Sequence, residues 1–349
     1  MGPYAGKLHV RFLEEFISNC LILVKKELNL LMKEAISIVI PVFNVKEYLP
    51  DCLESLIGQT FEMWNAILID DGSTDGSDEI CERYCTVDKR FYYYRQENAG
   101  VSVARNIGKE KCTGKYIFFM DADDTILSNT LEDLYNVAER EKADLVSFQF
   151  QKVRNNSEIE NVDSPTINEV CNTQEAMDLF LREQKIGISM CTKLVKNTII
   201  KDIEFEIGRK TNEDKFFLFE TLLRTSKVVV LNSKYYCYWT RQNSATTRPF
   251  DERWFDCVYF AQKIYTIIST ENPELEPQAR YQLLSVSYFL LRQMDKVGVQ
   301  NDFKNEYFDL IKTVKNIRIV DIWKYIAPRR KLGVAMIKII PQLYCFINR

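Results

Sequence analysis

Histidine is almost absent from this 349-residue sequence, which contains only His9. Hydrolases with a Ser–His–Asp triad, Cys–His proteases and His-rich zinc sites all depend on that side chain, so the sequence excludes these classes. Any acid–base chemistry has to use carboxylates, Lys, Tyr or Cys.

An excess of positive charge is missing as well. The chain has 46 Lys and Arg against 49 Asp and Glu, a formal net charge of −3. It therefore lacks the basic footprint of a nucleic-acid-binding protein, and we expect no such partner. The ten cysteines include no Cys-x-x-Cys pair and several lie in apolar runs, which is typical of reduced cytosolic thiols.

Long uncharged apolar runs are also lacking. Residues 12–31 come closest, but charged side chains interrupt them, so they predict an amphipathic helix and not a membrane-spanning one. No cleavable signal peptide is recognisable. We expect a cytoplasmic protein in which residues 1–31 form a helical extension before the fold.

An apolar run that ends in three carboxylates is the most informative feature present. Residues 116–120 predict a strand buried on both faces, as in a parallel sheet, and Asp121, Asp123 and Asp124 follow it. Ligands of open α/β sheets bind at the carboxyl ends of strands. An all-oxygen cluster suits Mg²⁺ or Mn²⁺, which would indicate a phosphate-bearing substrate. The alternative is an acidic turn that caps a helix beginning near Leu131.

Strands and helices alternate over the first part of the chain. Strands are predicted at residues 36–42, 66–69, 91–94, 116–120 and 145–150. Helices are predicted from Tyr48, after a cap at Thr74 or Ser77, at 101–111 and around Leu131. This order predicts an α/β fold with a doubly wound, mostly parallel sheet flanked by helices.

The later residues predict a loop at 151–169 and helices at 173–183, 213–224 and over most of 252–320. We divide the chain into the extension 1–31, a domain 32–240 with halves 32–142 and 143–240, and a helical extension 241–349. The tail 328–349 mixes basic and large apolar residues. It predicts either a helix lying on an anionic membrane surface or a final helix packed on the body.

Four sequence phrases stand at strand ends or helix starts, namely SIVIPVFN, ILIDDGSTDGS, ENAGVSVARNIG and FFMDADD. Together with QTF, in this order and spacing over residues 36–130, the series resembles glycosyltransferase family 2, the inverting GT-A enzymes that use nucleotide sugars. A looser match follows at residues 193–194, 212–217 and 235–239, which resembles the acceptor half of the bacterial branch.

The resemblance implies roles on the nucleotide side. Pro41 and Phe43 stand where the family lines the uracil or ribose pocket, and Asp71 stands where a carboxylate accepts from the base. An Asx-type turn before Gly72 is the structural alternative for Asp71. Arg105 opens a helix behind a glycine-containing loop, where it would meet a diphosphate or hold the acidic cluster in place.

The resemblance also implies the reacting groups. Asp121 and Asp123 form its Asp-x-Asp motif, whose last Asp binds Mn²⁺ or Mg²⁺ while the other approaches ribose, and Asp124 extends it. Asp214 matches the general base for the acceptor hydroxyl. Its neighbour Glu213 would point about 100° aside on a helix. The alternative is that both acids only favour a helix N-terminus.

Two further expectations concern the surroundings of the site. Trp239 and Arg241 are predicted to belong to a lid over the donor. The expected reaction is inverting transfer of a hexose or N-acetylhexosamine from a UDP-sugar to a glycan hydroxyl, with a polyprenyl-linked acceptor at the inner face of the plasma membrane, as in capsule or exopolysaccharide assembly. A glycosidase and a catalytically silent binding or scaffold protein are the alternatives.

Overall fold

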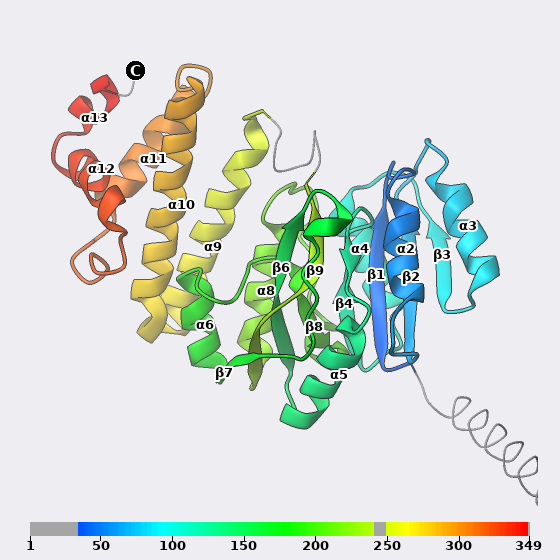
Figure 1. Cartoon of the computed structure of the whole chain (residues 1–349). Helices are drawn as coiled ribbons and strands as arrows, with labels where there is room; N and C mark the ends of the chain where they lie inside the picture. The colour runs from blue at the N-terminus through cyan, green and yellow to red at the C-terminus, as the bar shows by residue number, and fades with distance from the viewer. Residues whose placement is uncertain (1–33, 241–248, 348–349) are drawn as a thin grey trace, which may run out of the picture.

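The computed structural model describes residues 34–240 and 249–347 (Figure 1). The predicted extension 1–31, His9 and Arg241 lie outside the described residues. Two parts follow one another along the described chain: a sheet flanked by helices, and a set of helices at the end of the sheet far from its first edge strand (Figure 1).

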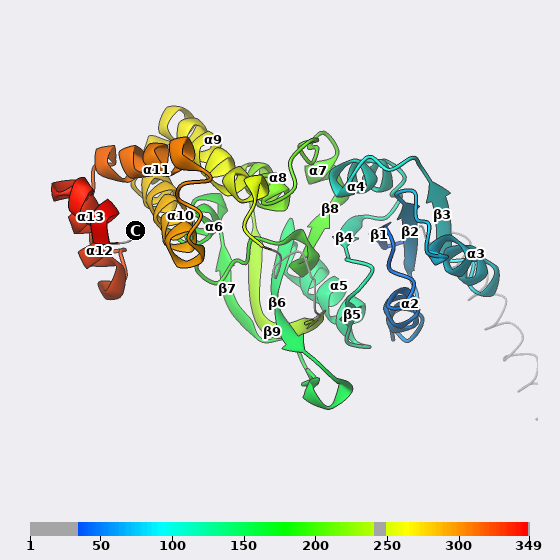
Figure 2. The same cartoon turned by 90° about the horizontal axis from the view of Figure 1, so that it is seen from above.

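The first half of the sheet contains the predicted alternation. Its elements are β1 (Ile36–Val42), α2 (Leu49–Ile57), β2 (Trp64–Asp70), α3 (Ser77–Val87), β3 (Phe91–Arg95), α4 (Val101–Glu110) and β4 (Tyr116–Phe119). The strands are parallel in the order β3-β2-β1-β4. Figure 2 shows α2 and α4 on opposite faces. The predicted doubly wound arrangement is confirmed here.

Burial on both faces explains why β1 and β4, in the middle of the sheet, are almost entirely apolar. Ile38 and Ile40 of β1 belong to the core shared with α2 and α3, whereas Val39 belongs to a core on the other face. Helix α4 packs so closely on that second face that a Cβ at Gly108 would lie 2.5 Å from Val39 Cγ1. Only glycine fits at this contact, because real side chains do not approach so closely.

The second half is mixed in direction. Its main elements are β5 (Thr125–Ile126), α5 (Thr130–Glu141), β6 (Leu145–Val153), β7 (Ile167–Cys171), α6 (Thr173–Leu181), β8 (Lys193–Lys196), α7 (Asn197–Ile200), α8 (Glu213–Arg224) and β9 (Val228–Trp239). The sheet continues β4-β8-β6-β9-β5, and β7 pairs with β9. Strand β8 is antiparallel to both of its neighbours, while β6 and β9 are parallel to each other.

Two local expectations were wrong. The predicted loop at 151–169 is shorter, because β6 continues to Val153 and β7 begins at Ile167, where backbone pairing with β9 outweighs the polar composition. Helix α3 follows Gly76, with φ at 94°, and not a side-chain cap from Thr74 or Ser77. The Asp75 carboxylate accepts from the Ser77 amide there at 3.0 Å.

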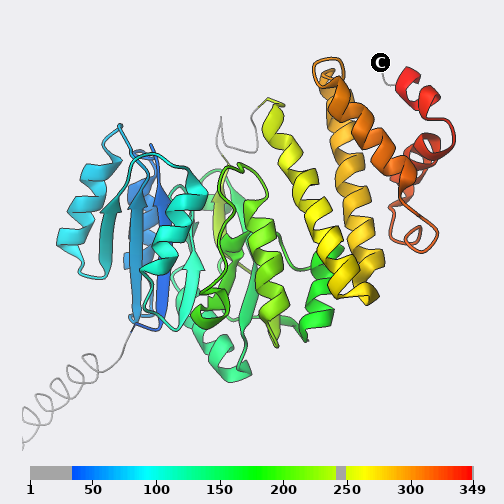
Figure 3. The same cartoon turned by 180° about the vertical axis from the view of Figure 1, so that it is seen from behind.

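The helical extension consists of α9 (Asp256–Glu271), α10 (Glu276–Val297), α11 (Lys304–Asn316), α12 (Pro328–Ile339) and α13 (Pro341–Ile347). It joins the sheet domain through α8, where the rings of Phe216 and Phe260 stack at 5.4 Å. Figure 3 shows α12 and α13, in red, beyond the orange helices α10 and α11. Within the described residues, no helix has the length and apolar character needed to cross a membrane.

The tail helices have two different faces. Val334 and Ile337 of α12 are buried in the core of the extension, and the Tyr344 hydroxyl donates to Asp295 Oδ2 at 2.8 Å. Leu332 and Ile339, which are 73% and 77% exposed, lie on the opposite face of the same helix. The packing alternative therefore describes the inner face of the tail, and an apolar stripe remains on the outer face.

Candidate functional site

Three parallel strands bring their carboxyl ends to one edge, as predicted. Strand β1 leads to Phe43, β2 to Asp71 and β4 to the acids that begin at Asp121. Phe43 is 48% exposed, an unusual position for a large apolar ring. Pro41 is partly buried and pairs with Ile69. A flat ring and three strand-end loops therefore border the same space.

The Asp71 carboxylate holds the loop that leads into α4. Its oxygens accept from Gln96 Nε2 at 2.7 Å and from the backbone amides of Ala99 and Gly100, both at 2.8 Å. The side chain is buried. The Asx-type turn considered for Asp71 is made by its neighbour Asp70, whose Oδ1 accepts from the Ser73 amide at 2.8 Å. A base would be contacted through the carboxylate lone pairs of Asp71 that do not accept hydrogen bonds from the loop.

Arg105 joins the two halves of the sheet domain. Its guanidinium is buried on α4 and contacts Asp121 Oδ1 and Glu213 Oε1, each at 3.0 Å. The ring of Phe205 lies 5.3 Å from its Cζ. Of the two predicted roles, holding the acidic residues in place is the one that these contacts show. Asn106, next to it, bonds both backbone groups of Phe205, at 2.9 and 2.8 Å, as expected for a structural residue.

The acids after β4 have separate surroundings. Asp124 is buried, and its Oδ1 accepts from the Trp239 amide at 3.0 Å. Burial raises its pKa to about 8, and Asp121 and Asp123 add to the increase. The Asp121 amide donates to the Tyr236 hydroxyl at 3.2 Å. The acidic turn does not cap a helix, because α5 starts at residue 130, after Asn129.

A metal cluster of all three carboxylates is not formed. Among the residues that the structure describes, no three His, Cys, Asp or Glu side chains are arranged to hold a metal ion. Asp124 turns into the protein toward β9, and Asp121 pairs with Arg105. Asp121 and Asp123 still suit a cation that takes most of its ligands from a substrate and from water, as Mg²⁺ does with phosphates.

Asp214 lies in the first turn of α8, and its Oδ1 accepts from the Lys215 amide at 2.8 Å. Burial raises its pKa to about 7; the adjacent Glu213 also raises it, and Arg105 opposes the increase. A carboxylate with this pKa is suited to accept a proton near neutral pH. Glu213 points to Arg105 instead, in agreement with the expected difference in direction.

Lys193 is a functional candidate that the sequence reasoning missed. It is fully buried at the start of β8, where its Nζ donates to the Ser189 carbonyl at 3.1 Å and to Thr192 Oγ1 at 2.8 Å. Burial lowers its pKa to about 7, and the charge of Asp214 opposes that decrease. Complete burial is what distinguishes Lys193 from most other lysines, and the burial of a charged residue in a short strand cannot be predicted from the sequence.

Trp239 contacts the turn that follows β4. Besides the bond from its amide to Asp124, its indole Nε1 donates to Thr125 Oγ1 at 3.0 Å. These bonds fix the turn after β4, and the lid role of Trp239 stays a prediction. Arg241, the other predicted lid residue, lies outside the described residues.

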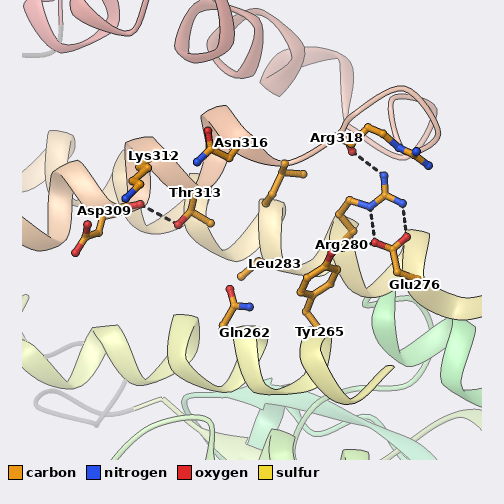
Figure 4. A pocket seen from close by; sticks show the side chains of 11 residues that line it. Gln262, Tyr265, Glu276, Arg280, Leu283, Asp309, Lys312, Thr313, Asn316 and Arg318 are labelled. Carbon is orange, nitrogen blue, oxygen red and sulfur yellow. Dashed lines mark hydrogen bonds and ion pairs between the residues drawn. The ribbon is translucent and has the colours of Figure 1, made fainter. Parts of the chain in front are cut away.

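A large groove lies elsewhere, in the helical extension. It has a volume of about 820 Å³ and is lined by α9, α10 and α11 (Figure 4). Arg280 is buried in its wall, where it pairs with Glu276 and donates to the Arg318 carbonyl at 3.0 Å. None of the strand-end acids lines this groove, so volume alone does not identify the chemical site.

Comparison with known proteins identifies the family to which this chain belongs. The model of the family described as glycosyl transferase family 2 matches residues 37–201. The glycosyltransferase GlyG of Streptococcus pneumoniae serotype 4 is 32% identical over 236 residues, which cover 64% of this chain and 76% of GlyG. The chain belongs to glycosyltransferase family 2. Its class of activity, glycosyl transfer, follows, and the motif resemblance is confirmed.

Other family 2 proteins show the extent of the likeness. The glycosyltransferase GlyA of the same organism is 34% identical over 274 residues, which cover 74% of this chain and 38% of GlyA, so the chain spans much less than that relative's length. The structure of S. aureus TarS residues 1–349 in complex with UDP-GlcNAc matches with a TM-score of 0.67 at 19% identity, covering 91% of this chain and 89% of the chain in that structure. The predicted fold, including the helical extension, is shared with this glycosyltransferase.

Proposed function

We propose that this glycosyltransferase moves a hexose or N-acetylhexosamine from a UDP-sugar to a hydroxyl of a glycan, with inversion at the anomeric carbon. The observation that carries the proposal is the position of Asp214. Its carboxylate, with a pKa near 7, stands next to Glu213, and the ion pairs of Arg105 connect Glu213 to the donor-side Asp121. One base and one leaving group on opposite sides of the sugar suffice for direct displacement.

In the proposed step, the acceptor oxygen forms a bond to the anomeric carbon while the bond from that carbon to the diphosphate oxygen breaks. The diphosphate leaves with the bonding electrons, and the acceptor proton goes to Asp214. Asp121 and Asp123 would hold Mn²⁺ or Mg²⁺, which when bound neutralises charge on the leaving diphosphate. Phe43 and Pro41 would border the base, and Asp71 would accept from the uracil imide.

The choice of UDP as the nucleotide is supported by the UDP-GlcNAc in the structure of TarS, which has a similar fold. The test is release of nucleotide from UDP-glucose, UDP-galactose, UDP-N-acetylglucosamine and GDP-mannose, with Mn²⁺, Mg²⁺, Ca²⁺ alone or EDTA. We expect turnover of a UDP-sugar with Mn²⁺ or Mg²⁺ and none with EDTA or Ca²⁺, since Ca²⁺ prefers more ligands at longer distances. Turnover of GDP-mannose alone, or full activity after exhaustive chelation, would contradict the donor or the metal.

The outer face of the tail supports a membrane-bound acceptor. Leu332 and Ile339 form an exposed apolar stripe on α12, and the exposed apolar residues Ile340 and Leu343 continue it toward α13. Arg329 precedes the stripe by one turn and Lys331 adjoins it. An amphipathic helix with this composition binds anionic lipid through both apolar burial and charge. We infer a peripheral enzyme on the inner face of the plasma membrane with a polyprenyl-linked glycan acceptor.

Because the inner face of α12 is packed, deletion of the tail would expose the core of the extension, and surface substitutions are the better test. Leu332→Ser with Ile339→Ser should lower sedimentation with phosphatidylglycerol vesicles by roughly tenfold or more. Val87→Ser, which changes an exposed apolar residue at the far end of the molecule, is the control. Equal vesicle binding by the double variant and the parent would show that the tail does not bind the membrane.

A further inference from the structure

Two aromatic rings, one exposed and one partly buried, pair across β6 and β9. Phe150 of β6 is 46% exposed, and the ring of Tyr238 in β9 lies 6.1 Å from it at an interplanar angle of 68°. Rings at this distance and angle make a favourable edge-to-face pair. The pair is at the carboxyl ends of two parallel strands, which is the edge where ligands bind in open α/β sheets.

Strand register places this pair on the same face as a residue of the site. Phe150 pairs with Tyr236, and Lys152 pairs with Tyr238, so alternate residues of both strands share that face. Tyr236 is the residue whose hydroxyl accepts from the Asp121 amide. Gln151 and Trp239 belong to the other face, where Trp239 bonds Thr125. The exposed rings thus continue outward from the residue that contacts the donor motif.

An irregularity in β9 produces this alignment. Between the pairs Gln149–Lys234 and Phe150–Tyr236, β9 has one extra residue, Tyr235. Tyr235 is buried, and its hydroxyl donates to Asp133 of α5 at 2.8 Å. Bulges of this kind turn side chains toward a new direction and are common beside active sites. Here Tyr235 bonds α5 inside the core, while Tyr236, which is also buried, contacts the Asp121 amide and Tyr238 stays partly exposed.

Sheet order separates this face from the nucleotide side. Strands β1 and β2 lie on one side of β4, whereas β8, β6 and β9 lie on the other. The rings therefore stand on the acceptor side of the acids, the side that also contains Asp214 and Lys193. Lys152 is exposed on the same face as the rings and supplies hydrogen-bond donors beside an apolar surface. Apolar rings with a few polar groups next to them are typical of small-molecule sites.

We propose that Phe150 and Tyr238, with Lys152, form the subsite for the pyranose ring of the acceptor that receives the new bond. The apolar C–H face of the sugar packs on the rings, and Lys152 donates to its hydroxyls. This inference rests on the proposed function, because it names where the acceptor binds in the same reaction.

The test uses methyl β-D-glucopyranoside, methyl β-D-galactopyranoside and methyl N-acetyl-β-D-glucosaminide as probes, in the presence of UDP and MnCl₂. Saturation-transfer NMR should show contact of one pyranose face with aromatic protons of the parent enzyme. Phe150→Ala should weaken binding of the preferred glycoside by about 3- to 10-fold, the effect of an aromatic contact. Phe150→Tyr should retain binding. UDP binding should stay unchanged in both variants, because the rings lie away from β1 and β2.

Phe308→Ala is the matched control. Phe308 is also 46% exposed and also lies against one tyrosine ring, but it belongs to α11 in the helical extension. It should bind each glycoside like the parent. Equal loss in Phe150→Ala and Phe308→Ala, unchanged binding in Phe150→Ala, or no glycoside binding by the parent would overturn the subsite. Failure of the parent to release UDP from any UDP-sugar would instead contradict the proposed function.

Discussion

The first half of the sheet domain, residues 34–142, and the second half, residues 143–240, are built in different ways. In the first half, the neighbouring parallel strands β1, β2 and β3 are joined through local helices, and Asp70 and Asp71 hold loops. In the second half, β8 enters between β4 and β6 from far along the chain, and Lys193 and Asp214 acquire shifted pKa values. The difference teaches that the first half places its loops through local connections, whereas the second half brings charged groups together from distant parts of the chain.

This contrast predicts the largest effect for Asp214. Asp214→Asn keeps the shape and removes the proton acceptor, so kcat should fall by about 10²- to 10⁴-fold. UDP affinity, measured by calorimetry, should remain nearly unchanged, because the proposed nucleotide site lies in the first half. A variant within a few-fold of the parent, or a product whose NMR spectrum shows retained anomeric configuration, would contradict single displacement by this base.

The pH profile sharpens the same point. Burial raises the pKa of Asp214 to about 7, and a base acts in its deprotonated form. The rate should therefore rise by about tenfold per pH unit below pH 7 and level off above it. The residual activity of Asp214→Asn should not show this rise with pH. A parent enzyme whose rate does not change between pH 5 and 7 would show that a group other than Asp214 accepts the proton of the acceptor hydroxyl.

Arg105 tests whether the halves depend on each other. Arg105→Met leaves Glu213 buried without its partner and should lower the free energy of unfolding by about 3 kcal/mol. Urea unfolding of Arg105→Met, Glu213→Gln and the double variant should show a double-variant loss below the sum of the single ones. Arg95→Met removes a more exposed pair with Asp78 and should lower the free energy of unfolding much less than Arg105→Met. Additive losses would mean that the buried contact does not couple the halves.

Asp71 is expected to give the smallest effect, and one confined to binding. Asp71→Ala should weaken UDP binding by about 1 to 3 kcal/mol through loss of a charge-assisted hydrogen bond. Gln96→Leu removes a single support of the same loop, the 2.7 Å bond to Asp71, and separates loop support from base contact. Equal UDP affinity in Asp71→Ala and the parent would exclude Asp71 from the pocket. Equal losses in both variants would assign Asp71 to the loop alone.

Sequence patterns were sufficient where structure is local. Apolar runs predicted β1, β2 and β4 because each of these strands is buried on both faces, and the acids after β2 and β4 reached one edge because parallel strands end together. Helix α8 was predicted with its bounds, Glu213–Arg224. The bond between the Trp239 amide and Asp124 was not readable from the sequence, since it joins residues more than 100 positions apart.

The sequence by itself determined the family, the alternation of strands and helices, and the positions of the motif acids, because these depend on neighbouring residues and short spacings. Tertiary structure alone decided that Arg105 joins Asp121 to Glu213, that Lys193 is buried, that the bulge at Tyr235 turns Phe150 and Tyr238 outward, and that the tail has a packed and an exposed face. Each of these depends on segments far apart in the chain, and burial, which sets both charge and exposure, exists only once those segments have packed together.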